Sequence, residues 1–109
     1  MKVLTLISTA IAAAAFVSLP AAAQDADAVQ KLLKAEGCTK CHSVDKTKKG
    51  PAFKKVAADL KGKADAEQKL TKFLTTSPKV KLDDGSEEEH KALKDPKATA
   101  NVIKWILSQ

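Results

Sequence analysis

The sequence predicts an all-α fold of four to five short helices. Apolar residues recur every three or four positions in several stretches, which is the spacing that places them on one face of a helix. Glycine, proline and acidic residues stand where such helices should begin and end. Only one short run alternates like a strand, and no second run offers it a partner. We therefore expect one helical domain without internal repeats or linkers.

The first helix is predicted over residues 25–36, where apolar positions follow an acidic first turn. Gly37 is placed to end this helix, because glycine readily adopts the left-handed conformation that closes many helices. After a lysine-rich loop, Gly50-Pro51 turns the chain into a second short helix that ends near Gly62. The apolar positions of these two helices are Val29, Leu32, Leu33, Phe53, Val56, Ala57 and Leu60.

The third helix is predicted over residues 65–75, with Leu70, Phe73 and Leu74 facing inward, and Ser77-Pro78 ends it. Residues 79–82 alternate between lysine and apolar side chains but have no partner strand, so we expect an extended loop.

Ser86 followed by Glu89 fits a capping box, which favours a helical turn within residues 86–94. Asp95-Pro96 then supplies the N-cap and the first residue of a final helix. Its inward positions are Ala98, Val102, Trp105 and Ile106.

A C-x-x-C-H motif directly follows the first predicted helix and contains both cysteines of the chain, Cys38 and Cys41. Two thiols at this spacing can each bond one vinyl group of a haem, and the imidazole of His42 can then ligate the iron. A redox-active dithiol needs a βαβ surround and a zinc site needs further ligands, and the sequence offers neither. A simple disulfide stays open as an alternative. The motif therefore predicts one covalently attached haem c.

Residues 1–23 have the pattern of a secretory signal peptide. Lys2 supplies a positive end, the apolar run that follows is short for a bilayer, and Ala21 and Ala23 fit the small-residue rule of a cleavage site. An uncleaved membrane anchor is the competing interpretation. We expect a mature domain of residues 24–109, exported to the periplasm as a soluble monomer without stable membrane association.

The chain is basic, with a formal net charge of +6, and it contains 19 lysines and no arginine. Nucleic-acid readers favour the bidentate contacts of arginine, so we expect no nucleic-acid partner. An acidic redox protein is the expected partner. The mature chain has few aromatic residues and a small core, so we expect it to depend on its haem for stability.

Taken together, these residues resemble the class I c-type cytochromes, in particular the small bacterial ones with a single haem. The likeness rests on Glu36-Gly37-Cys38, the C-x-x-C-H motif, the run from Gly50 to Phe53 and the closing helix that ends Lys104-Trp105-Ile106-Leu107-Ser108-Gln109. It implies the class I cytochrome c fold, in which the first and last helices cross and Leu33 meets Trp105. It also implies that Cys38 and Cys41 carry the haem thioethers, that His42 is the proximal ligand, and that the carbonyl of Pro51 accepts the other ring N–H of His42.

The sequence departs from this family at the second axial ligand. The family usually supplies a methionine from the loop before the last helix, but the only methionine here is Met1. His90 stands in that loop, and imidazole is a good iron ligand, so we predict it as the distal ligand. An open sixth position, or a weak ligand such as Lys79, Lys81 or Asn101, are the alternatives.

The expected function is a periplasmic one-electron carrier rather than an enzyme, because a haem with both axial positions filled has no place for substrate. Imidazole in place of methionine sulfur predicts a relatively low reduction potential. The alternative is a gas-binding or sensing haem protein with an open or displaceable distal site.

Overall fold

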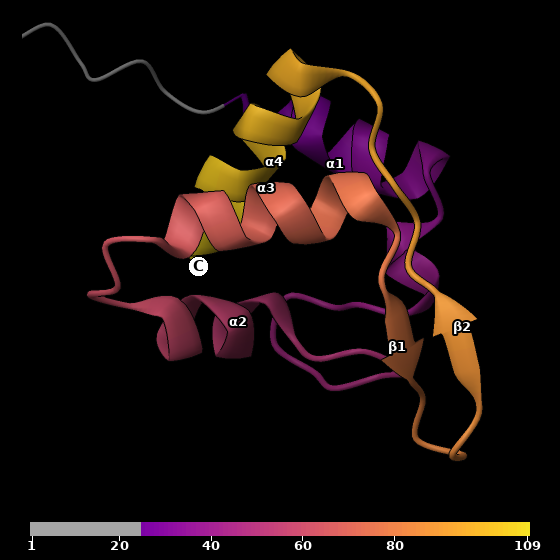
Figure 1. Ribbon diagram of the computed structural model, residues 1–109. Helices are drawn as coiled ribbons and strands as arrows, with labels where there is room; N and C mark the ends of the chain where they lie inside the picture. The colour runs from indigo at the N-terminus through magenta and orange to yellow at the C-terminus, as the bar shows by residue number, and fades with distance from the viewer. Residues whose placement is uncertain (1–24) are drawn as a thin grey trace, which may run out of the picture.

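The computed structural model describes residues 25–109, which form four α-helices, one 3₁₀ turn and a two-stranded hairpin (Figure 1). In chain order the elements are α1 (Ala26–Ala35), the 3₁₀ turn η1 (Cys38–Lys40), α2 (Phe53–Leu60), α3 (Ala66–Thr76), β1 (Lys79–Lys81), β2 (Glu87–Glu89) and α4 (Pro96–Leu107). The predicted helical class is confirmed, with the hairpin as an addition. The predicted signal peptide, 1–23, lies outside the described residues and stays a prediction. Within residues 25–109, no helix is long and apolar enough to cross a membrane.

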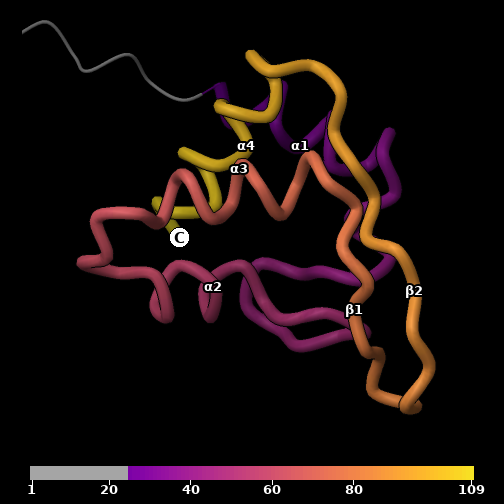
Figure 2. Tube along the Cα trace, in the orientation of Figure 1, coloured from indigo at the N-terminus to yellow at the C-terminus, as the bar shows by residue number. Residues whose placement is uncertain are grey.

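Helix α4 contacts each of the other three helices, so its inner face forms the middle of the core (Figure 2). Phe53 packs its ring edge-to-face against Trp105, with the ring centroids 5.2 Å apart. Each large apolar side chain buried in this way contributes about 1.5–3 kcal/mol to folding. The main buried cluster contains Val29, Leu33, Phe53, Leu93, Val102, Trp105 and Ile106. Leu33 and Trp105 both belong to this cluster, and α1 contacts α4, in agreement with the crossing of the first and last helices that the resemblance implied.

The helix ends follow the predicted signals closely. The Asp25 carboxylate accepts a hydrogen bond from the backbone N–H of Ala28, and α1 begins there. Gly37 has a φ of +73°, the left-handed conformation that ends α1 and turns the chain into the C-x-x-C-H motif. Asp95 caps α4 by accepting from the N–H groups of Lys97 and Ala98. These local side chains fix where the helices that flank the motif begin and end.

The expectation of an extended loop without a partner strand at 79–82 is wrong. β1 pairs antiparallel with β2, and the register sets Lys79 opposite Glu89 and Lys81 opposite Glu87. Opposite charges that face each other across an antiparallel pair stabilise it modestly. In Figure 1 this hairpin extends beyond the ends of α2 and α3. Its two strands are three residues long and rich in charged side chains.

The helical turn predicted within residues 86–94 is also wrong. The Gly85 N–H donates to the Leu82 carbonyl at 3.0 Å, which closes a β-turn over residues 82–85. The Leu82 N–H then donates to the Ser86 carbonyl at 2.8 Å, and the Ser86 N–H donates to the Asp84 carboxylate at 2.9 Å, so Ser86 lies in a hairpin loop and caps no helix. Gly85 takes a φ of +84° in that turn. The stretch that follows has no helical stripe of apolar residues, so pairing with β1 satisfies its backbone instead.

Helix α3 buries only part of the face predicted to point inward. Leu70 and Leu74 pack against the main core, as expected. Phe73 does not, because 39 % of its surface is exposed, and it is the one large hydrophobic residue exposed to this degree within the described part of the chain. Its ring instead contacts His90.

Candidate haem site

The C-x-x-C-H motif forms one tight turn at the end of α1. The backbone N–H groups of Cys41 and His42 both donate to the Cys38 carbonyl, at 3.2 and 2.9 Å. Cys38 and Cys41 are half-buried free thiols, and no disulfide joins them. Burial raises the pKa of the Cys38 thiol, and the nearby Glu36 carboxylate raises it further. The raised pKa favours the protonated form of the Cys38 thiol.

Two contacts hold the His42 ring: a hydrogen bond to the Pro51 carbonyl at its edge and the Phe53 ring stacked on its face. His42 Nδ1 lies 2.7 Å from the Pro51 carbonyl oxygen. Because a carbonyl only accepts, Nδ1 carries the proton and Nε2 keeps its lone pair. The ring also stacks on Phe53, with centroids 5.2 Å apart and an interplanar angle of 25°. A neutral imidazole with a free Nε2 is the ligating form of histidine.

The loop from Cys41 to Phe53 is held to the motif by backbone hydrogen bonds. Gly50 N–H donates to the Cys41 carbonyl at 2.7 Å, and Phe53 N–H donates to the Ser43 carbonyl at 2.9 Å. The Lys48 ammonium donates to the Thr39 carbonyl at 2.7 Å. These bonds place Pro51 beside His42 and start α2 with Phe53 under the imidazole.

Gly50 leaves space for the His42 ring. This role of Gly50 was not predicted from the sequence. A Cβ at this position would lie 2.5 Å from His42 Cε1 and 2.9 Å from Nδ1, too close for any side chain. The backbone and the imidazole therefore approach each other more closely than any other residue type allows.

Gly50→Ala should displace the His42 ring and destabilise the protein by about 1–3 kcal/mol, the usual effect of overpacking. Absorption spectra and thermal unfolding of the holoprotein would measure both effects. Gly62→Ala is the control, because a Cβ there meets nothing within 4 Å although its φ is +76°. The control should lower stability slightly and leave the haem spectrum unchanged; an unchanged Gly50→Ala spectrum would contradict the account of His42.

His90 directly follows β2, and its backbone is held by the end of α3. Its N–H donates to the Pro78 carbonyl at 2.9 Å, and Leu93 N–H donates to the Leu74 carbonyl at 2.8 Å. His90 Nδ1 lies 3.1 Å from the Lys91 carbonyl oxygen, so Nδ1 carries the proton and Nε2 is again free. Burial is the largest influence on the pKa of His90 and lowers it; the hydrogen bond with the Lys91 carbonyl opposes this effect, His42 adds to it, and the net pKa lies below the ordinary histidine value. The imidazole is therefore neutral near pH 7.

The two imidazoles lie across a narrow space from each other. Their ring centroids are 6.0 Å apart and the rings are inclined by 55°. Metal–nitrogen bonds of about 2 Å on opposite sides of one metal set two imidazole centroids about 6 Å apart. The separation of the two rings is therefore the one expected if both imidazoles bind one iron. Of the alternative ligands, Lys79 and Lys81 are exposed on β1 and Asn101 is half-buried on α4.

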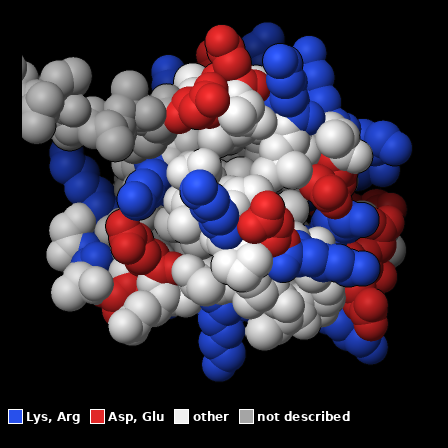
Figure 3. All heavy atoms as spheres, turned by 90° about the horizontal axis from the view of Figure 1, so that it is seen from above, with Lys and Arg blue, Asp and Glu red and all other residues white. Residues whose placement is uncertain are grey.

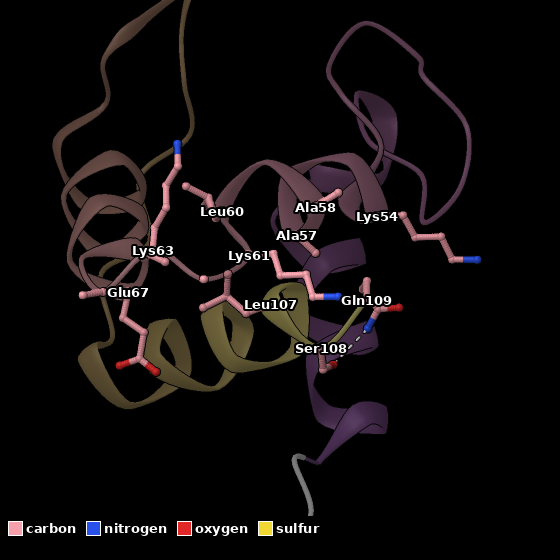
Figure 4. A pocket seen from close by; sticks show the side chains of 13 residues that line it. Lys54, Ala57, Ala58, Leu60, Lys61, Lys63, Glu67, Leu107, Ser108 and Gln109 are labelled. Carbon is pink, nitrogen blue, oxygen red and sulfur yellow. Dashed lines mark hydrogen bonds between the residues drawn. The ribbon is translucent and has the colours of Figure 1, made fainter.

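A hollow of the described residues lies away from the two histidines. It has a volume of about 660 Å³ and lies between α2, the turn that leads to α3 and the C-terminal end of α4 (Figure 4). Lysine, alanine and leucine side chains line it, with Glu67, Ser108 and Gln109, and none of its lining residues is a cysteine or a histidine. The arrangement of cysteines and imidazoles, rather than this hollow, defines the candidate haem site.

This helical fold and its C-x-x-C-H turn define a class I cytochrome c. The model of the cytochrome c family matches residues 26–109, and the chain belongs to that family. It is a small electron-carrier haem protein with covalently bound haem c. The predicted family, fold class and cofactor are thereby confirmed.

The chain is similar to cytochrome c-551 of Pseudomonas aeruginosa, with 34 % identity over 85 residues that cover 72 % of this chain and 73 % of that one. It is also similar to the crystal structure of the class 1 cytochrome MtoD from Sideroxydans lithotrophicus ES-1. The identity there is 49 %, the TM-score is 0.74, and the match covers 77 % of this chain and 95 % of that one. Cytochrome c552 of Nitrosomonas europaea shares the fold, with a TM-score of 0.60 at 24 % identity over 72 % of this chain and 96 % of that one.

Proposed function

We propose that this chain is a periplasmic one-electron carrier with a bis-histidine haem c. Cys38 and Cys41 would form the two thioethers, and His42 and His90 would be the proximal and distal ligands. The observation that carries the proposal is the pair of imidazoles 6.0 Å apart, each with Nδ1 on a backbone carbonyl. Covalently bound haem c supplies a ferric–ferrous couple that gains and loses one electron.

The chain's own residues would keep that couple from doing other chemistry. His42 is held by Pro51 and Phe53, and His90 is tied to the end of α3, so neither imidazole needs to move when an electron arrives. With His42 and His90 both bound to the iron, no position would remain for a substrate, which supports a carrier rather than an enzyme. Imidazole from His90 in place of methionine sulfur would lower the reduction potential.

The proposed periplasmic location rests on the signal-like pattern of residues 1–23. That pattern has a positive end, a short apolar run and a small-residue cleavage site. The carrier would then work as a soluble monomer after cleavage. Cell fractionation, with mass measurement of the purified protein, tests this: loss of the first 23 residues plus the mass of one haem is expected.

The proposed partner is a redox protein with an acidic docking surface. All lysines in the described part of the chain are exposed. On the face seen in Figure 3, lysines and acidic residues are interspersed, so steering there would be weak. Six exposed lysines would border the edge of the bound haem that stays open to solvent: Lys40, Lys46, Lys48, Lys49, Lys79 and Lys81.

Electron transfer from the reduced protein to an anionic oxidant such as ferricyanide should slow as salt is added, because steering by a charged patch raises rates about 10-fold or more and fades with screening. Replacing Lys46 and Lys49 with glutamine should lower the low-salt rate. Lys61 and Lys63, on the turn before α3, are the matched control pair and should have a smaller effect. Equal effects of the two pairs would count against a localised patch.

A further inference from the structure

Phe73 has an unusual position for a large aromatic residue. It lies on α3 near Leu70 and Leu74, which pack on the core, yet it is 39 % exposed and outside the main core cluster. Large apolar side chains gain most by burial, so core packing does not account for this one.

The ring of Phe73 meets His90 edge-to-face. The ring centroids are 4.8 Å apart and the interplanar angle is 63°, within the range that aromatic pairs prefer. His90 is thus contacted by Phe73, faces His42, and holds its Nδ1 on the Lys91 carbonyl.

The main chain around His90 is attached to the same helix. Pro78, just after α3, accepts from the His90 N–H, and Leu74 of α3 accepts from the Leu93 N–H. These bonds fix where the His90 backbone lies but leave the imidazole free to turn about its Cα–Cβ and Cβ–Cγ bonds. The Lys91 carbonyl holds one ring atom at 3.1 Å, and the Phe73 ring packs against the imidazole edge-to-face, where it would oppose rotation of the ring plane.

We propose that Phe73 is a positioning residue that sets the rotation of the His90 imidazole and thereby the angle between the two axial rings. The inference rests on the proposed ligation by His90. The relative orientation of two axial imidazoles controls the splitting of the iron d orbitals, which the g values of the ferric protein report directly. The 55° between the His42 and His90 rings is the angle that Phe73 maintains.

The test is electron paramagnetic resonance of the ferric holoprotein with Phe73→Leu, Phe73→Tyr and Leu70→Ala. Phe73→Leu should keep a low-spin spectrum but shift and broaden the largest g value, because the imidazole then samples several rotations. It should also make CO binding to the ferrous protein about 2- to 10-fold faster, since one aromatic contact to the ligand is lost. Phe73→Tyr keeps the ring edge and should match wild type.

Leu70→Ala is the control for a merely structural role. Leu70 packs against the core one turn earlier on α3, so its truncation should lower thermal stability without moving the g values. Unchanged g values in Phe73→Leu, or an equal shift in Leu70→Ala, would overturn the positioning role of Phe73 and leave the proposed ligation by His90 standing. A wild-type protein that is high-spin at neutral pH would remove the proposed ligation, and this inference with it.

Discussion

His90→Ala should convert a low-spin ferric protein into a high-spin one at neutral pH. His90 is the proposed distal ligand, and its ring centroid lies 6.0 Å from that of His42, so its removal should leave the sixth position to water or nothing. The ferrous variant should bind CO with an apparent affinity about 10-fold or more above wild type, because the binding-competent fraction is no longer limited by a protein ligand. Optical spectra and CO titration measure both changes.

Lys94→Ala is the matched control, since Lys94 lies in the same segment but is exposed. It should behave as wild type. Added imidazole should restore the low-spin spectrum of His90→Ala, which separates loss of a ligand from loss of the fold. If His90→Ala keeps the neutral-pH spectrum of wild type, another group ligates the iron; if wild type is itself high-spin and binds CO rapidly, the gas-binding alternative gains.

Cys38→Ala or Cys41→Ala should reduce the amount of haem-containing protein several-fold when expressed with haem-attachment machinery. The core is small and is gathered around α4, so the chain depends on the haem to offset its conformational entropy. A loss of about 1–2 kcal/mol already changes abundance several-fold. Haem-stained gels and mass spectrometry give the yield and the number of thioether bonds.

Thr39→Ala is the control for this experiment, because Thr39 stands between the two cysteines and uses its backbone carbonyl, which alanine retains, to accept the hydrogen bond from Lys48. It should accumulate normally with both thioethers. Normal yield of a folded, colourless Cys38→Ala protein would refute the dependence on haem.

The sequence predicted those parts of the fold that local chemistry decides. Asp25, Gly37 and Asp95 end or begin helices through contacts within a few residues, and all three act as expected. The β1–β2 hairpin was not predicted because its strands are three residues long and lack the β-branched run that signals a strand. Pairing across the turn, with lysine opposite glutamate, decides that conformation, and a local pattern does not reveal it.

The candidate site was predictable to a similar degree. C-x-x-C-H is local, and the Pro51 carbonyl was expected beside His42, where it lies at 2.7 Å. His90 was chosen by its place in the chain, and its position opposite His42 is consistent with that choice. The contributions of Gly50 and of the Phe73 ring depend on three-dimensional proximity between separate elements, so no spacing in the sequence indicated them.

The most direct test of ligation by His42 and His90 is near-infrared magnetic circular dichroism of the wild-type ferric holoprotein at neutral pH. The energy of the charge-transfer band identifies the pair of axial ligands. Bis-histidine ligation predicts a low-spin band at the energy typical of two imidazoles, and this band should disappear in His90→Ala. A band typical of histidine with lysine, or a high-spin spectrum in wild type, would contradict the assignment of His90.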